Sequence, residues 1–109
     1  MKGDTKMIIS TTNEIQGKTL EVIGVVTGST VQTVNVVRDI GASLRTIVGG
    51  EVKKYNEMME NARGLATERM ISAATGMGAD AVVAVRFSTS SIMQGAAEFM
   101  VYGTAVKFV

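Results

Sequence analysis

The chain has 109 residues, of which 46% are hydrophobic and 19% charged, a composition that predicts one folded domain and excludes disorder. Its 11 Lys and Arg residues nearly balance its 10 Asp and Glu residues, so we expect no nucleic-acid partner and no attraction to anionic lipid. The absence of His and Cys excludes disulfides and removes the commonest general base and the commonest transition-metal ligands.

The first six residues do not fit the pattern that follows them. We interpret residues 1–6 as a flexible leader or an artificial remnant, ahead of a single domain over residues 7–109. No secretory apolar region follows the leader, and the longest apolar run, Ala81 to Val85, is far shorter than the roughly 20 residues of a membrane-spanning helix. We therefore expect a soluble cytoplasmic protein without a membrane partner.

The first predicted elements are strands. Ile8 to Thr12 is a weak β segment. Leu20 to Thr27 is rich in Val and Ile and apolar on both faces, which predicts a buried strand. The triplet Gly28-Ser29-Thr30 is expected to end that strand, and Thr30 to Val37 alternates enough to be extended.

Two helices are predicted next. Arg38 to Val48 has apolar residues at spacings of three and four, which indicate one face of a short helix ended by Gly49-Gly50. Glu51 to Gly76 keeps the same periodicity and predicts a helix about 39 Å long. A sheet of short strands would leave part of this apolar face uncovered, so we expect another copy of the chain to cover it.

The last predicted elements are two consecutive strands. Gly76-Met77-Gly78 ends the long helix, and Ala81 to Ser88 follows as a nearly all-apolar strand. Ser88 to Gly95 is expected to be a polar loop, and Ala97 to Val109 a long strand with a bulge or close-packing point at Gly103. Strands, then helices, then two strands predict an α+β domain with one short and one long helix on one face of a mainly antiparallel sheet.

Several short motifs together resemble a known family. They are Val36-Val37-Arg38-Asp39-Ile40-Gly41-Ala42, Gly49-Gly50-Glu51, Tyr55, Asn61-Ala62-Arg63, Gly78 to Phe87, and Tyr102 to Val106. Their order and spacing resemble the YbjQ-like family, small bacterial and archaeal proteins of uncharacterised function described as "putative heavy-metal-binding". The resemblance implies a dodecin-like β-α-β-β subunit in a pentameric ring. Members often carry Gly-Glu after the buried strand where this chain has Gly28-Ser29, so a function of that Glu is not carried over.

Heavy-metal binding finds little support in the residues themselves. Soft metals prefer thiolate, thioether or imidazole ligands, and the 8 Met residues offer only thioethers. Met usually fills gaps in a core, so we expect packing roles for most of them. Glu57 and Glu60, one helical turn apart, are expected to form a solvated helix face as readily as a hard-ion site. We predict no metal site and no cofactor.

No catalytic arrangement is visible either. The hydroxyls from Ser88 to Ser91 have no nearby base that could activate them. Gly76-Met77-Gly78 follows a helix and precedes a strand, the reverse of a phosphate-binding loop, so we interpret it as a helix C-cap. We therefore expect that the protein is not an enzyme.

Charged residues inside apolar stretches are the remaining candidates for function. Arg63 and Arg86 interrupt apolar faces, and we expect them mainly in structural contacts with carboxylates or carbonyls. Arg38 and Asp39 open the predicted short helix, where Asp39 can interact favourably with the helix N-terminus. Asp39 is the favoured partner of Arg63. The alternative is that the arginines, with Asn35, bind an anion or another small ligand at a junction between subunits. Two functions stay open, a homo-oligomeric ring that binds a small ligand and a scaffold ring without one.

Overall fold

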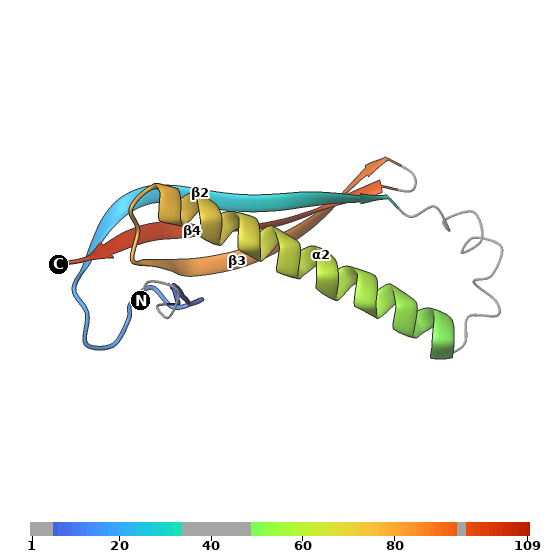
Figure 1. Cartoon of the computed structure of the whole chain (residues 1–109), viewed down its shortest axis with the longest axis horizontal. Coiled ribbons are helices and arrows are strands. Elements are labelled where there is room, and N and C mark those ends of the chain that lie inside the picture. Colours follow the sequence, from blue (N-terminus) through green and yellow to red (C-terminus); the bar gives the residue numbers. More distant parts are fainter. Residues whose placement is uncertain (1–5, 34–48, 94–95) are drawn as a thin grey trace.

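The computed structural model describes residues 6–33, 49–93 and 96–109, and it is an α+β domain (Figure 1). The elements in chain order are β1 (Ile8–Ile9), β2 (Leu20–Thr33), α2 (Gly49–Gly76), β3 (Ala81–Met93) and β4 (Ala96–Phe108). The strands form one sheet in the order β1-β3-β4-β2, in which β1 runs parallel to β3 and the other neighbours are antiparallel. The predicted α+β class and mainly antiparallel sheet are confirmed. The predicted short helix over Arg38 to Val48 lies outside the described residues.

The long helix α2 crosses one face of the sheet, above β2 and β4 (Figure 1). It has 28 residues and is therefore about 42 Å long, which confirms the long helix predicted from residue spacing. Gly49 and Gly50, predicted to end the preceding helix, belong to the first turn of α2. Figure 1 shows the N-terminal part of α2 diverging from the sheet.

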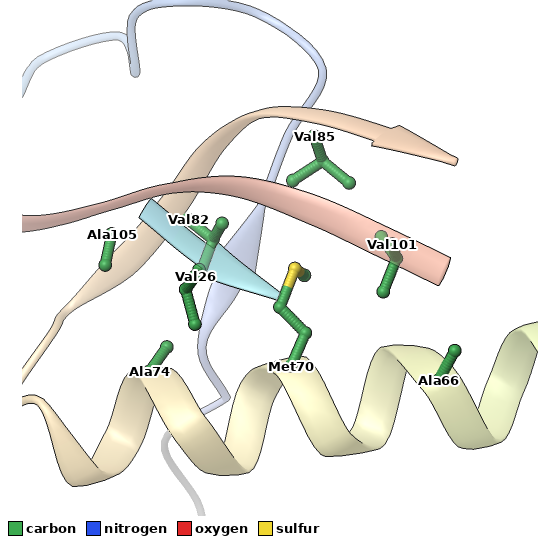
Figure 2. Close-up of a cluster of buried hydrophobic side chains, with 8 residues drawn as sticks. All are labelled: Val26, Ala66, Met70, Ala74, Val82, Val85, Val101 and Ala105. Carbon is green, nitrogen blue, oxygen red and sulfur yellow. The ribbon is translucent and has the colours of Figure 1, made fainter. Parts of the chain in front are cut away.

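The core lies between α2 and the sheet. Ala62, Ala66, Met70 and Ala74 recur every four residues and are all buried, so they form the packed face of the helix. Figure 2 shows Met70 pointing from α2 towards the valines of the strands. The cluster drawn there consists of Val26, Ala66, Met70, Ala74, Val82, Val85, Val101 and Ala105. Because most helix residues in this face are Ala, the helix backbone can lie close to the sheet.

Gly28 shows how close the helix comes. A Cβ at Gly28 would overlap the main-chain oxygen of Ala66 and the main-chain nitrogen of Met70, and would lie 2.9 Å from the Met70 Cα. The prediction that Gly28-Ser29-Thr30 ends the strand is therefore wrong: β2 continues to Thr33, and Gly28 allows the helix backbone to contact the strand. Glycine often marks a turn, but Gly28 lies inside a strand, where its missing side chain leaves room for the helix backbone.

A second close approach occurs within the sheet at Gly103. A Cβ there would lie 2.7 Å from Val82 Cγ1 and 2.9 Å from the Val83 oxygen, so the close-packing point predicted for Gly103 is confirmed. The irregularity itself lies opposite, in β3, where the register shifts between Val83 and Arg86. Ala84, inside this shift, has a φ of 54°, a conformation that costs an alanine steric strain.

The predicted loop over Ser88 to Gly95 is also corrected. Strand β3 continues to Met93, and Ser88 to Ser91 pair in regular register with Met100 to Ala97 of β4. The Ser and Thr side chains had indicated a loop, but strands with a solvated face accept such residues. Strand β4, over Ala96–Phe108, agrees closely with the predicted Ala97 to Val109.

The helix ends as its glycines indicate. Gly78 has a φ of 80°, and the Ala79 N–H donates to the Ala74 oxygen at 3.0 Å, which closes the last turn. Asp80 then contacts the end of β4, where its carboxylate accepts a hydrogen bond from the Phe108 N–H at 2.8 Å. The chain thus passes from α2 into β3 without a long loop, and the C-cap interpretation of Gly76 to Gly78 is confirmed.

Candidate functional site

The face of the sheet opposite α2, which we call the open face, is divided into a covered end and an exposed end. At the covered end, Ala81, Val83 and Val106 are buried and pack against Ile15, Leu20 and Phe108. Because side chains alternate along a strand, residues paired directly across β2 and β4 lie on the same face. Gly28 faces the α2 backbone, so the β2 residues one or three positions away, Val25, Thr27 and Val31, point to the open face. Their partners in β4, Thr104, Tyr102 and Glu98, lie on the same face.

Apolar side chains are unusually exposed on the open face. Val22 is 69% exposed, Val25 75% and Val31 53%, and Tyr102 on the neighbouring strand is 38% exposed. Single exposed apolar residues are ordinary on a protein surface, but a series along one sheet face indicates contact with a partner. The open face is the first candidate for a functional surface.

A hollow of about 430 Å³ lies at the covered end of the open face. Val22, Val83 and Val106 contribute apolar side chains to its lining, and the chain segment before β2 adds Glu14 and Lys18. The Lys18 ammonium lies 4.8 Å from the centre of the Phe108 ring, a distance typical of a cation–π contact. The hollow combines apolar surface with one cation and one carboxylate, but Lys18 already has an aromatic partner.

Arg86 holds the N-terminal segment against β3. Its Nη1 donates to the Thr11 oxygen at 3.1 Å and to the Val85 oxygen at 2.9 Å. The main chain adds two bonds nearby, from Val85 N–H to the Ser10 oxygen at 2.9 Å and from Ala84 N–H to the Thr12 oxygen at 2.8 Å. These carbonyl contacts are of the structural kind that the sequence analysis favoured for Arg86.

Arg63 lies elsewhere, on an exposed position of α2. Arg86 pairs with Tyr102 and so points to the open face, whereas α2 lies on the other face, so one chain does not bring Arg63 and Arg86 together. Asn35, Arg38 and Asp39 lie outside the described residues. The Arg63–Asp39 pair and the ligand site at a subunit junction therefore stay predictions.

Arg69 has a role that the sequence reasoning missed. It lies within Glu51 to Gly76, where apolar residues recur at spacings of three and four, and its Nη1 donates to the Ser29 oxygen of β2 at 2.8 Å. The guanidinium thus spans from the helix to a main-chain carbonyl of the last strand in the sheet. A charged residue inside an apolar stripe was the signal, but only the packing of α2 beside β2 identifies its partner.

The residues that could hold a metal are dispersed. Over residues 6–33, 49–93 and 96–109, no three carboxylates gather at one place. Glu57 and Glu60 are exposed on α2, whereas Met70 is fully buried in the core, where it has the packing role expected of it. Met77 and Met93 are 38% and 64% exposed, on different elements.

The only long helix of the described chain, α2, is too polar to cross a lipid bilayer, and no other described segment forms a helix that could.

Comparisons with known proteins agree with this architecture of one long helix on a mainly antiparallel sheet. A crystal structure of a protein of unknown function from Pediococcus pentosaceus, of the DUF74 family, superposes with a TM-score of 0.68 at 15% identity. The superposition covers 94% of this chain and 98% of that one, and it shows a shared fold. The chain belongs to the YbjQ_1 family, described as "Putative heavy-metal-binding", whose model matches residues 7–109.

Relatives in sequence are of the same family. A UPF0145 protein of Clostridium novyi is 54% identical over 103 residues, which cover 94% of this chain and 100% of the relative. A UPF0145 protein of Thermosipho melanesiensis is 55% identical over 104 residues, with 94% and 96% covered. The family resemblance found in the sequence is confirmed, and it names a family whose function is uncharacterised.

Proposed function

We propose that the protein is a homo-oligomer that binds a small anionic or metal-bearing ligand at the junctions between its subunits, and that it is not an enzyme. The observation that carries this proposal is the exposure of Val22, Val25 and Val31 on the open face, 53% to 75% in a single chain. A chain with only 5% aromatic residues has few large side chains to bury, and association would cover these valines. A pentameric ring, which the YbjQ-like resemblance implies, is the assembly we favour.

The ligand part of the proposal rests on arginine chemistry and on the family description. Arg63 is exposed on α2, and a guanidinium presents a planar set of donors suited to carboxylate and phosphate groups. A metal would reach such a site more readily as part of an anionic ligand than as a free ion, because the chain contains no imidazole and no thiolate. This reading reconciles the description "Putative heavy-metal-binding" with the residues present.

A scaffold ring without a small ligand is the alternative. The same exposed valines favour it, because they require only self-association and no ligand.

Native mass spectrometry of protein taken directly from cells separates these two functions. We expect a multiple of the 11.5 kDa chain mass with an additional retained mass at a fixed ratio to subunits. Arg63→Gln is expected to lose the retained mass, whereas Lys53→Gln, which also removes one exposed cation from α2, is expected to keep it. An oligomer without added mass would favour the scaffold, and a monomer at micromolar concentration would overturn both functions.

A further inference from the structure

Over residues 6–33, 49–93 and 96–109, no strand pairs with the outer edge of β2. β2 is the last strand of the sheet, and its 14 residues contain no Pro and a single charge, Glu21. Long edge strands normally carry lysines, prolines or bulges, because their unpaired N–H and C=O groups bind other strands. The bulge between Val22 and Gly24 affects only one end of β2. Between that bulge and Thr33, the side-chain hydrogen bond described on this edge is the one that Arg69 donates to the Ser29 oxygen.

The opposite edge of the sheet is half covered. Strand β1 pairs with Ala81 and Val82, and the main chain of Ser10 and Thr12 accepts bonds from the N–H groups of Val85 and Ala84. Beyond that point, over residues 86–93, no strand of the described chain pairs with the outer side of β3.

This uncovered part of β3 also exposes apolar side chains. Phe87 is 53% exposed, Ile92 50% and Met93 64%, and Arg86 is the one charged residue in the segment. The segment therefore has the same character as β2, an accessible backbone beside apolar side chains and almost no charge.

We propose that β2 of one copy pairs through its main chain with residues 86–93 of β3 in the next copy, so that the sheet continues from subunit to subunit. The occupant is a second copy because one chain carries both edges, on opposite sides of one sheet. A foreign strand on either edge would leave the other unpaired. Two different surfaces in contact give a heterologous interface, which closes into a ring when its rotation permits. This inference rests on the proposed self-association and specifies which surfaces form the junction.

The pairing is tested by blocking each edge separately with lysines, which natural edge strands use against pairing. Val25→Lys/Val31→Lys alters exposed positions of β2, and Thr89→Lys/Ser91→Lys alters exposed positions of β3. Each variant alone is expected to be an 11.5 kDa monomer by light scattering at micromolar concentration. Circular dichroism checks that each remains folded.

The mixture of the two variants gives the decisive result. The β2 variant retains a free β3 edge and the β3 variant a free β2 edge, so an equimolar mixture should form a one-to-one dimer of twice 11.5 kDa and nothing larger. The control, Asn61→Lys/Ser72→Lys, adds the same charge to exposed positions of α2 and should assemble as the unmodified protein does.

Thr27→Pro tests the β2 backbone directly. The Ser29 oxygen accepts a hydrogen bond from Arg69 on the side of β2 that faces away from β4. Main-chain N–H and C=O groups of residues two positions apart in a strand point to the same side of that strand. The Thr27 N–H therefore faces the outer edge, and a proline there removes an outward donor without removing a bond to β4. We expect Thr27→Pro to dissociate the assembly as the β2 lysine variant does.

Other outcomes would overturn the pairing. Wild-type assembly in both edge variants would show that neither edge is used. Dissociation of the β2 variant alone would show that copies meet through β2 or the open face and do not use the β3 edge. A monomeric unmodified protein would instead overturn the self-association on which the pairing depends.

Discussion

Replacing Gly28 by alanine probes the contact that sets the distance between helix and sheet. The added Cβ would overlap the Ala66 oxygen and the Met70 nitrogen, both main-chain atoms of α2, and would lie 2.9 Å from the Met70 Cα, whereas ordinary contacts lie at 3.4–4 Å. No side-chain rotation relieves such an overlap, so the helix must move away from the strand. The movement also loosens Met70, which is fully buried.

The size of the effect follows from the cost of overpacking. Added carbon in a packed core costs typically 1–3 kcal/mol and sometimes more, and because this Cβ would clash with main-chain atoms of α2, we expect a cost of about 3 kcal/mol. For a domain of about 100 residues, 1 kcal/mol shifts Tm by about 4–8 °C, so Gly28→Ala is expected to lower Tm by about 12–24 °C. Thermal unfolding followed by circular dichroism, with both proteins at the same concentration, measures this change in Tm.

Gly64→Ala is the matched control. Gly64 lies inside α2, and a Cβ there meets nothing within 4 Å, so alanine should raise stability by about 0.5–1 kcal/mol through helix propensity. Opposite signs for the two glycine substitutions are the expected result. A Gly28→Ala protein within about 0.5 kcal/mol of the unmodified one would refute the close helix–strand contact.

Three further predictions concern metal binding, strain and charge pairing. Isothermal calorimetry should detect no submicromolar zinc affinity, since zinc sites are built from thiolate, imidazole and carboxylate ligands and the first two are absent; a stoichiometric tight site would contradict this. Ala84→Gly should raise the free energy of unfolding by up to about 1–2 kcal/mol, because glycine adopts the φ of 54° without steric cost, and a loss of stability in urea unfolding would exclude strain at this bulge. If Asp39 pairs with Arg63, the double alanine variant should lose less stability than the two single alanine variants added together. We expect a difference of up to about 1 kcal/mol, because Arg63 is exposed; additive losses would show that the two residues are uncoupled.

The sequence by itself determined the elements whose periodicity is strong. Residue spacing identified the helix from Glu51 to Gly76, the apolar content of Ala81 to Val85 and Ala97 to Val109 identified β3 and β4, and the order of elements gave the α+β class. Local signals were sufficient there because burial imposes a period on each element separately. The family was also accessible, because its motifs are local and their spacing is retained over residues 7–109.

The candidate site was less accessible from the sequence. The sequence identified Arg63 and Arg86 as charges beside apolar residues. It did not indicate that Arg86 donates to the Thr11 and Val85 carbonyls, or that Arg69 donates to the Ser29 carbonyl. Val22 and Val25 were also expected to lie in a strand buried on both faces, yet they are 69% and 75% exposed. Which face of a strand a helix covers depends on residues far away in the chain, and local composition does not encode it.

Tertiary structure alone decided where the strands end. Gly28 and the hydroxyls of Ser88 to Ser91 are local signals for turns and loops, yet both lie within strands. Gly28 lies in a strand because the α2 backbone occupies the space of its missing side chain, and the hydroxyl run lies in β3 because pairing with β4 satisfies its backbone. In both places a contact with a distant segment outweighs the preference of the residue itself, and that contact exists only once the chain has folded.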